Sequence, residues 1–170
     1  MVEPGRRLEG MRLIIKALVL DPAEADNVPD DYSFVDFWRD SHIVRDDDGY
    51  QQFMISKEDG EEVARLELDL EVERSAFIDS TYPMEAEGKP LLEIQFIDVR
   101  EKHRRSGIGA LAVQHLEQEY PDHQLIALAD DRSEKFWEAL GWTLVRPEDT
   151  LRPDLYIAPV VATGAEAVSE

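Results

Sequence analysis

Branched apolar residues that alternate with polar ones, or run without interruption, predict a series of strands along the chain. The predicted strands cover residues 12–20, 50–56, 62–72, 91–99, 124–129, 143–145 and 155–157. The turn sequence KEDGE joins the second strand to the third, so these two form a hairpin, and strict alternation in the third predicts one dry face. The run 124–129 is apolar throughout, which is typical of a buried parallel strand.

Helical spacing of apolar residues predicts three helices between these strands. They cover about Ser33–His42, a stretch with its apolar stripe at Ile108, Leu111, Ala112 and Leu116, and Ser133–Leu140. Asp131 and Glu134 are spaced like a cap and its partner at the start of the last helix, and Gly141 ends it. The polar stretch 21–31 is expected to be a loop, and 73–90 an irregular connection with room for a short helical turn.

Length and composition indicate one globular domain. The 170 residues are 43% hydrophobic, which supports a single core, with residues 1–10 as a loose leader, 11–158 as the domain and 159–170 as a flexible tail. The chain has no cysteine, so disulfides, thiolate metal sites and a cysteine nucleophile are excluded.

The net charge narrows the choice of partners. With 18 Lys and Arg against 38 Asp and Glu, the net charge is −20, which repels phosphate backbones and anionic membranes. We therefore expect neither nucleic acid nor membrane as a partner. The charge is interpreted as a solvated surface, with attraction of a cationic substrate as the alternative.

The sequence predicts a cytoplasmic protein that holds no metal. No apolar run approaches the ~20 residues of a membrane span, and Lys16 interrupts the apolar stretch that follows the N-terminal arginines. The 4 histidines lack metal-binding spacing, and Asp46–Gly49 lacks the remaining ligands of a calcium loop.

The stretch KHRRSGIGAL, residues 102–111, places basic residues and two glycines between a predicted strand and a predicted helix. Unpaired main-chain N–H groups and the positive end of the helix dipole meet at such a position, which can bind an anion. Gly107 and Gly109 let the main chain approach an anion without a Cβ in the way. Basic residues cluster here, at Arg100, Lys102, Arg104 and Arg105. They indicate a phosphate-bearing ligand, with a glycine-lined turn and ordinary surface basic residues as the alternative; the spacing matches neither the P-loop nor G-x-G-x-x-G.

The stretches VREKHRRSGIG, residues 99–109, and DDRSEKFWEALGW, residues 130–142, resemble two motifs of the GNAT family of acyl-CoA-dependent N-acyltransferases. The first is similar to the family's cofactor motif, with Arg104, Gly107 and Gly109 at its defining positions. The second resembles the second family signature. The resemblance implies an α/β (α+β) fold of one domain, with a mixed central sheet of about six to seven strands flanked by helices, and acetyl-CoA as the acyl-donor substrate.

The resemblance also implies which residues hold the cofactor. Main-chain amides around 104–110 would bind the pyrophosphate, with Arg104 and neighbouring basic residues supporting the phosphates. The pantetheine arm would pair with the strand edge at 97–99. The cofactor-binding residues implied by the two motifs are Ile97, Val99, Arg104, Arg105, Ser106, Gly107, Ile108, Gly109, Ala110, Asp130, Ser133, Phe136 and Trp137.

Acyl transfer from a thioester to an amine needs a neutral amine, a polarised carbonyl and a proton for the departing thiolate. Because the chain has no cysteine, direct transfer in a ternary complex is the economical mechanism, with the carbonyl polarised by a strand N–H such as that of Val99. Glu93 stands where the histone-acetylating branch of the family carries a catalytic glutamate, and it is the expected base, with Asp98 and Gln95 as alternatives. Trp137 stands where members often carry a tyrosine acid, and an indole N–H cannot supply a proton to a thiolate, so the acid stays open.

The leading interpretation is an N-acetyltransferase for a small amine or a protein amino group, with acceptor recognition around 26–38 and 146–156. The alternative is a GNAT-fold protein that binds acyl-CoA without turnover, as a sensor or interaction module. Nucleotide binding by the same loop is disfavoured because no Walker lysine accompanies the glycines. The acceptor, the acyl-chain length and the formation of a homodimer stay open.

Overall fold

The structure is a computed structural model that describes residues 10–44, 49–78, 82, 88–129, 132–149 and 151–160. Its strands are β1 Leu13–Ala17, β2 Tyr50–Lys57, β3 Glu62–Asp69, β4 Leu91–Val99, β5 Gln124–Ala129, β6 Thr143–Val145 and β7 Asp154–Ile157. Its helices are α1 Val35–Val44, α2 Ser75–Ile78, α3 Ile108–Glu119 and α4 Glu134–Ala139, with the 3-10 helices η1 Pro22–Asn27 and η2 Glu101–His103. Most of the predicted leader and tail lies outside the described residues, and the domain boundaries stay predictions.

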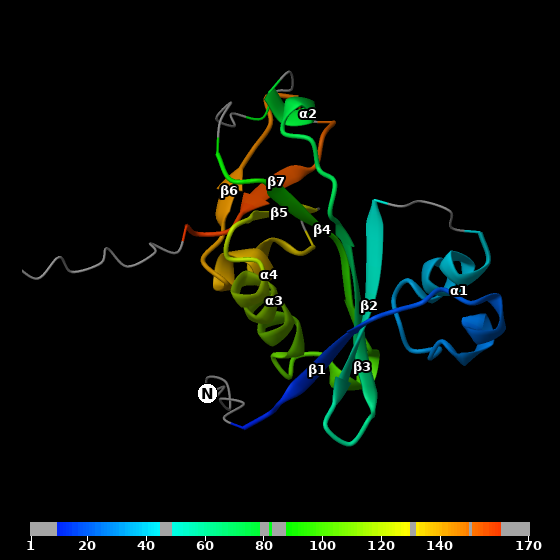
Figure 1. Cartoon of the computed structure of the whole chain (residues 1–170). Helices are drawn as coiled ribbons and strands as arrows, with labels where there is room; N and C mark the ends of the chain where they lie inside the picture. Colours follow the sequence, from blue (N-terminus) through cyan, green and yellow to red (C-terminus); the bar gives the residue numbers. More distant parts are fainter. Residues whose placement is uncertain are drawn as a thin grey trace, which may run out of the picture. The chain divides into compact units, whose positions relative to one another are not determined.

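The strands form a seven-stranded mixed sheet in the order β1-β2-β3-β4-β5-β7-β6 (Figure 1). β2 pairs antiparallel with β1 and β3, and β7 pairs antiparallel with β5 and β6. β4 and β5 pair in parallel and are joined through α3, the kind of long connection that parallel neighbours require. The predicted α/β (α+β) fold with six to seven strands is confirmed, as are the hairpin and the parallel strand 124–129.

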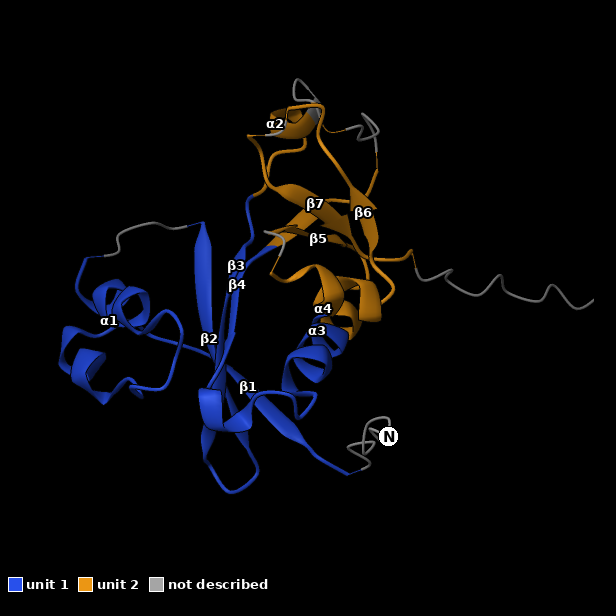
Figure 2. Ribbon diagram, turned by 180° about the vertical axis from the view of Figure 1, so that it is seen from behind, with its two compact units in different colours: residues 1–71, 94–116 blue, residues 72–93, 117–170 orange. Residues whose placement is uncertain are grey.

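The chain forms two compact units (Figure 2). One consists of Met1–Glu71 and Ile94–Leu116, and the other of Val72–Glu93 and Glu117–Glu170. The first therefore contains β1, β2, β3, α1 and the C-terminal part of β4, whereas the second contains α2, β5, α4, β6 and β7. Each unit has a buried apolar cluster of its own.

In the first unit, aromatic side chains join α1 to β4. The buried cluster consists of Val28, Tyr32 and Trp38, with Val35, Phe37 and Phe96 packed against it. The ring centroids of Phe37 and Phe96 lie 4.4 Å apart. The helical spacing of the aromatic residues in the sequence thus correctly predicts a helix here, shifted to Val35–Val44.

β3 is buried on both faces, which corrects the expectation of one dry face. Residues 63–68 are all buried, including two charged ones. Arg65 Nε donates to Glu62 Oε1 at 2.7 Å, and Gln52 Nε2 donates to Glu67 Oε2 at 2.8 Å. Because these hydrogen bonds satisfy the polar side chains, the polar face of the strand is buried as well as the apolar one.

The N-terminal segment departs from the prediction in two places. The strand expected over 12–20 is limited to β1, and the expected loop 21–31 contains η1. Asp21 begins η1, because its carboxylate accepts the main-chain N–H of Ala23 at 2.9 Å. Pro22 at the first position favours the same start, since proline fits the first turn of a helix.

The later helices agree more closely with the prediction. The buried face of α3 contains Val113 in place of Leu111, which the predicted apolar stripe includes; the other stripe residues are buried as predicted. Ser133 precedes α4 without a side-chain cap hydrogen bond, and Asp131, the predicted cap, lies outside the described residues. Gly141 has a φ of 76° and ends the helix as predicted.

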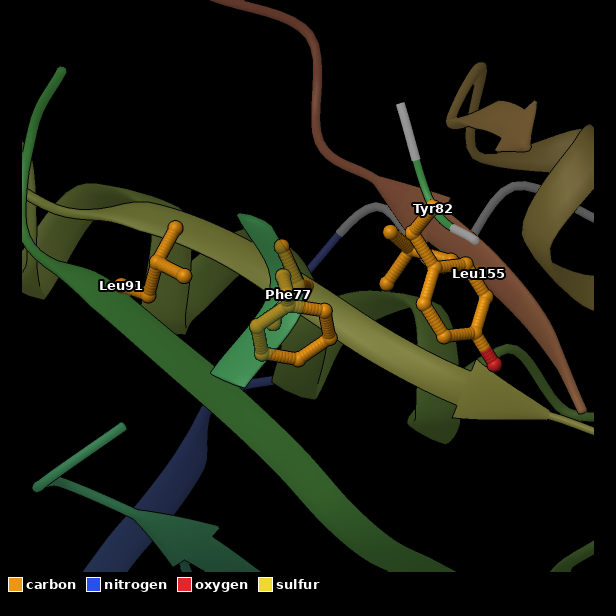
Figure 3. Close-up of a cluster of buried hydrophobic side chains, with 5 residues drawn as sticks. Phe77, Tyr82, Leu91 and Leu155 are labelled. Atoms are coloured by element: carbon orange, nitrogen blue, oxygen red, sulfur yellow. The ribbon is translucent and has the colours of Figure 1, made fainter. Parts of the chain in front are cut away.

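The second unit has a hydrophobic core around β5 (Figure 3). It consists of Phe77, Tyr82, Leu91, Ile126 and Leu155. Phe77 comes from α2, the short helical turn expected in 73–90, and its ring centroid lies 5.9 Å from that of Tyr82. The Tyr82 hydroxyl donates to the main-chain O of Pro153 at 2.5 Å, so the polar atom of this core tyrosine is satisfied.

Candidate functional site

The segment between β4 and α3 follows the path of an anion-binding loop. After η2, the chain turns through Arg105 with a φ of 59° and Gly107 with a φ of 84°. The left-handed conformation is unfavourable for a residue with a Cβ, so the surrounding structure holds Arg105 in it. Ser106 Oγ donates to the main-chain O of His103 and closes the turn.

Main-chain N–H groups gather where this loop enters α3. The Leu111 N–H bonds to the O of Gly107 at 3.0 Å, so the N–H groups of Ile108, Gly109 and Ala110 precede the first bond inside the helix. The Ile108 side chain is buried and anchors the turn, whereas Gly107 is exposed. Together with the positive end of the helix dipole, this arrangement can bind an anion.

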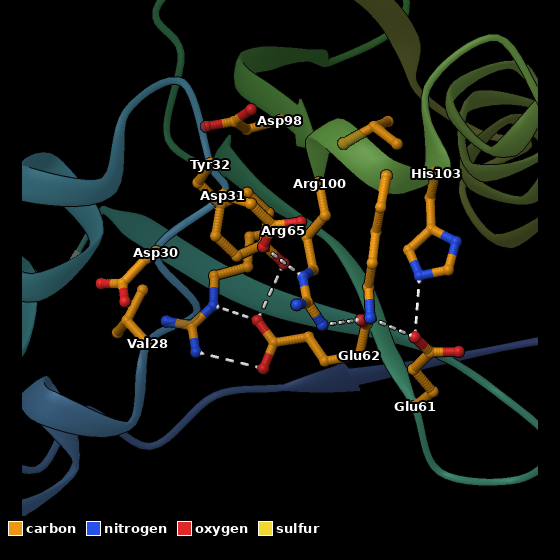
Figure 4. A network of polar contacts seen from close by, with 12 residues as sticks. Val28, Asp30, Asp31, Tyr32, Glu61, Glu62, Arg65, Asp98, Arg100 and His103 are labelled. Carbon is orange, nitrogen blue, oxygen red and sulfur yellow. Dashed lines mark hydrogen bonds and ion pairs between the residues drawn. The ribbon is translucent and has the colours of Figure 1, made fainter.

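Two of the four basic residues near the loop are neutralised by acids from distant segments (Figure 4). Arg100 donates from Nε to Asp31 Oδ1 at 2.7 Å and from Nη1 to the main-chain O of Glu62 at 2.9 Å. Lys102 Nζ lies 2.6 Å from Glu61 Oε1. The cluster of four basic residues in the sequence therefore overstates the positive charge that a ligand meets.

Glu61 binds three basic side chains at the turn between β2 and β3. Lys57, Lys102 and His103 all contact its carboxylate, the last with Nε2 at 3.0 Å from Oε1. The hydrogen bonds from Lys102, Lys57 and His103, in that order, hold the pKa of Glu61 well below its usual value. Glu61 thereby ties the hairpin turn to η2, immediately before the anion-binding loop.

Arg104 and Arg105 differ in their contacts. Arg104 donates from Nε to the main-chain O of Val99 at 3.0 Å and from Nη2 to Ser33 Oγ at 2.6 Å. The Arg105 side chain is exposed and contacts no partner among the residues that the structure describes. Of the cluster, Arg105 is therefore the side chain best placed to meet a ligand.

Asp98 is occupied by hydrogen bonds that hold the start of α1. Asp98 is 3% exposed. Its carboxylate accepts hydrogen bonds from the main-chain N–H of Ser33 at 3.3 Å, the main-chain N–H of Phe34 at 2.9 Å and the indole N–H of Trp38 at 3.1 Å. Three donors engage its two oxygens, so the structure favours an anchoring role over the alternative that Asp98 acts as a base.

Glu93, the predicted base, lies in the part of β4 that belongs to the second unit. It is 7% exposed and in register with Ile126 of β5. Burial raises the pKa of Tyr82. Nearby negative charges, including the charge of Glu93, raise it further. Gln95, Ile97 and Val99 are half-buried in the part of β4 that belongs to the first unit.

The second motif builds an aromatic stack in the second unit. Trp137 is 3% exposed, and its ring centroid lies 4.6 Å from that of Trp142 and 6.1 Å from that of Tyr156. Phe136 and Ser133 are half-buried, and Asp130 lies outside the described residues. The aromatic residues of α4 thus pack in a core, and a role in cofactor binding stays a prediction.

Two polar atoms of this stack lack a partner. Within the described part of the chain, the Nε1 of Trp137 and the hydroxyl of Tyr156 are buried and make no hydrogen bond. Burial raises the pKa of Tyr156, so its hydroxyl is protonated at neutral pH. Such atoms are rare in protein interiors because each forfeits its hydrogen bonds to water.

The first unit contains a polar network that the sequence patterns do not predict (Figure 4). Tyr32 donates its hydroxyl proton to Glu62 Oε1 at 2.8 Å, and Arg65 donates to the same oxygen. Arg65 Nη1 lies 3.3 Å from Nε2 of His42. Burial and then the charge of Arg65 lower the pKa of His42, while burial and then Glu62 raise that of Tyr32. The signal in the sequence is the presence of charged residues, Glu62, Arg65 and Glu67 among them, within a strand whose remaining residues are apolar.

The described residues form neither a metal-binding group nor a helix that could span a membrane. They contain no group of three or more His, Asp or Glu side chains placed to hold a metal ion. None of their helices has the length and apolar character needed to cross a membrane.

Comparison with known proteins gives a family and a fold. The model of the acetyltransferase (GNAT) family matches residues 15–142. No curated protein matches the chain. Among solved structures, AtaTR bound with acetyl-CoA has a TM-score of 0.60 at 14% identity, with 87% of this chain and 93% of that one covered.

Two further structures share the fold. AtaT complexed with acetyl-methionyl-tRNAfMet has a TM-score of 0.59 at 13% identity, with 85% of this chain and 94% of that one covered. The ribosomal-protein-S18-alanine N-acetyltransferase from Escherichia coli has a TM-score of 0.53 at 16% identity, with 91% and 98% covered. At these identities the likeness shows the fold and leaves the substrate open.

Proposed function

Because the chain belongs to the acetyltransferase (GNAT) family, we propose that it is an N-acetyltransferase that moves the acetyl group of acetyl-CoA to a primary amine of a small molecule or a protein. The observation that carries this proposal is the glycine-containing turn between β4 and α3, with its N–H groups at the helix start. Such a turn has the chemistry that a pyrophosphate requires. The chain has no cysteine to carry an acyl group, which supports direct transfer in a ternary complex.

The proposed cofactor site follows the two motifs. The main-chain amides around 104–110 bind the pyrophosphate, and the Arg105 guanidinium meets its negative charge. The pantetheine arm pairs with the main chain of 97–99 like an added strand. Ser133, Phe136 and Trp137 contact the cofactor from the second signature, in the manner that the family resemblance implies.

The proposed reaction is one nucleophilic substitution at the thioester. The neutral amine attacks the carbonyl carbon, the C–S bond breaks, and an amide and the CoA thiolate form. Glu93 takes the proton that the amine loses, and the N–H of Val99 polarises the carbonyl. Trp137 cannot protonate the thiolate, so another side chain, water or unassisted departure completes the step.

The alternative function is binding of acyl-CoA without turnover. The observation that favours it is Trp137, which replaces the tyrosine of the second signature and lies in a core stack. Glu93 opposes it, because the family resemblance places a catalytic glutamate at this position of the strand.

Two measurements test the proposal. The first is calorimetric titration with acetyl-CoA, and the second is thiol release in the presence of polyamines, aminoglycosides, amino acids and lysine peptides. We expect binding and amine-dependent release of CoA. Glu93→Gln should bind acetyl-CoA as the wild type does but lose most turnover, whereas Glu138→Gln, at an exposed position of α4, should lose neither. Binding without turnover across the panel would favour the sensor function, and no binding would refute the proposed site.

Further properties stay predictions from the sequence: a cytoplasmic location, no metal and no nucleic acid. AtaT, one of the structural neighbours, is solved with a tRNA. The net charge of −20 opposes such a partner for this chain.

A further inference from the structure

Two segments far apart in the sequence are held together in the first unit. The segment 31–34 precedes α1, and the segment 98–104 links β4 to the anion-binding loop. Arg100 bonds to Asp31 through its side chain, and the Glu101 N–H bonds to the main-chain O of Asp31 at 2.8 Å. Main-chain and side-chain contacts thus join the entry of α1 to the exit of β4.

Asp98 and Arg104 make further contacts between these segments. The Asp98 carboxylate accepts two main-chain N–H groups before α1, those of Ser33 and Phe34, and the side-chain N–H of Trp38. Arg104 Nη2 donates to Ser33 Oγ at 2.6 Å and lies 3.9 Å from Asp98 Oδ1. A single arginine therefore touches both the serine and the carboxylate that fix the helix start.

The Arg104 guanidinium is engaged by the protein itself. Its Nε holds the carbonyl of Val99, the last residue of β4, and its Nη2 holds Ser33. These contacts occupy two of the Arg104 nitrogens, whereas Arg105, the next residue, is exposed with no partner among the described residues. The two neighbouring arginines therefore have different surroundings and different capacities for binding.

We propose that Arg104 is a positioning residue that couples acetyl-CoA binding at the loop to the order of the α1 segment 31–44, rather than a ligand of the cofactor phosphates. The inference rests on the proposed function, because acetyl-CoA is the ligand that acts on the loop. Arg104 contacts both Val99 at the exit of β4 and Ser33 at the start of α1, so acetyl-CoA bound at the loop stabilises the same arrangement that holds the start of α1. By linkage, whatever stabilises the α1 segment also tightens acetyl-CoA binding.

Hydrogen exchange in the full-length protein tests the coupling directly. We expect acetyl-CoA to slow exchange at the amides of Ser33, Phe34 and Trp38 in the wild type. Ser33→Ala, at an exposed position, removes the Arg104 contact and should abolish most of this added protection. Arg105→Gln, measured at saturating acetyl-CoA, should keep it.

A double-mutant cycle on the acetyl-CoA dissociation constant gives the second readout. Ser33→Ala and Arg104→Gln should each weaken binding, and the double variant should be no weaker than the worse single one, because both remove the same contact. The non-additive factor is expected to be at least about threefold. Arg104→Lys, which can still reach one acceptor, should recover part of the affinity.

Salt dependence separates positioning from phosphate contact. Salt screens the attraction between a cation and a nearby phosphate, so each such pair steepens the slope of log K against log salt. Arg105→Gln should therefore flatten this slope, while Ser33→Ala and Arg104→Gln lower the affinity and leave the slope unchanged. Repeating the titration with dephospho-CoA shows whether Arg105 meets the 3′-phosphate, in which case its effect disappears, or the pyrophosphate, in which case it persists.

The outcomes distinguish this inference from the proposed function. Three results would each overturn the coupling while leaving a protein that binds acetyl-CoA. They are additive losses of affinity in the double-mutant cycle, a flattened salt-dependence slope for Arg104→Gln, and hydrogen exchange at the α1 amides of the wild type that does not change when acetyl-CoA binds. If the folded wild type binds no acetyl-CoA, the proposed function itself fails.

Discussion

Replacing Tyr156 with phenylalanine should leave the protein as stable as the wild type or more stable. The hydroxyl of Tyr156 is buried, at 0% residue exposure, and has no hydrogen-bond partner among the described residues. Phenylalanine keeps the ring that stacks on Trp137 and removes only this oxygen. An unsatisfied buried polar group costs about 1–3 kcal/mol, so its removal should raise the free energy of unfolding by about 1 kcal/mol.

Tyr32 provides the matched control, because the same substitution there removes a satisfied hydroxyl. Tyr32 is buried, and its hydroxyl donates to Glu62 Oε1 at 2.8 Å. Hydrogen bonds to charged groups contribute about 1.5–3 kcal/mol. Glu62 keeps its bond to Arg65 in the variant, so the expected loss from Tyr32→Phe lies within this range.

Urea unfolding and thermal melts of the two variants measure the difference. For a domain of this size, 1 kcal/mol shifts the melting temperature by about 2–4 °C. Tyr156→Phe should thus melt at or slightly above the wild type, and Tyr32→Phe several degrees below it. A loss for Tyr156→Phe as large as that for Tyr32→Phe would refute the reasoning, because the Tyr156 hydroxyl would then have a partner in the folded protein.

Two further substitutions test how stability depends on pH. Burial and Arg65 lower the pKa of His42 from 6.5, so the unfolded chain binds more protons and stability falls as the pH drops below this value. In urea unfolding at pH 7.5 and 5.5, His42→Gln should lose less stability on acidification than the wild type; an equal loss in both would contradict the prediction. The bonds from Lys102, Lys57 and His103 lower the pKa of Glu61 from 4.5, so its contribution is present above that pH and is lost as the pH falls. Glu61→Gln should be less stable than the wild type at pH 7, with the gap closing below pH 4.5, whereas Glu58→Gln, at an exposed position, should match the wild type throughout; a gap that persists in acid would count against this origin.

Local patterns predict the strands and the loop that follows β4. β4 and β5 have the predicted bounds because each is an apolar run between turn-forming residues. The start of α3 and the end of α4 follow from Gly107 and Gly141, both in the left-handed conformation that glycine favours. These features depend on neighbours in the sequence, so the sequence alone reveals them.

Contacts between distant segments are beyond the reach of local patterns. Asp98 stands out in the sequence as a charge in an apolar strand, which fits a base as well as it fits an anchor. Its partner Phe34 lies 64 positions away, and Ser33 lies 71 positions from Arg104. Likewise, the basic residues at 100–105 do not reveal in the sequence that Glu61 neutralises Lys102. This ion pair depends on how the turn between β2 and β3 lies relative to η2 in the folded protein.

β1 comes first in the order of the sheet, and its position has a consequence for solubility. A strand at the margin of a sheet offers unpaired main-chain groups to strands of other molecules. Ile14 is 40% exposed and Val19, just beyond β1, is 87% exposed, so this edge of the sheet also exposes apolar side chains that favour association. Lys16 is exposed between them, and a charged side chain on a marginal strand discourages pairing with a second chain. The lysine that interrupts the apolar run of the sequence thus acts as a gatekeeper against aggregation, a protection that Lys16→Ile would remove.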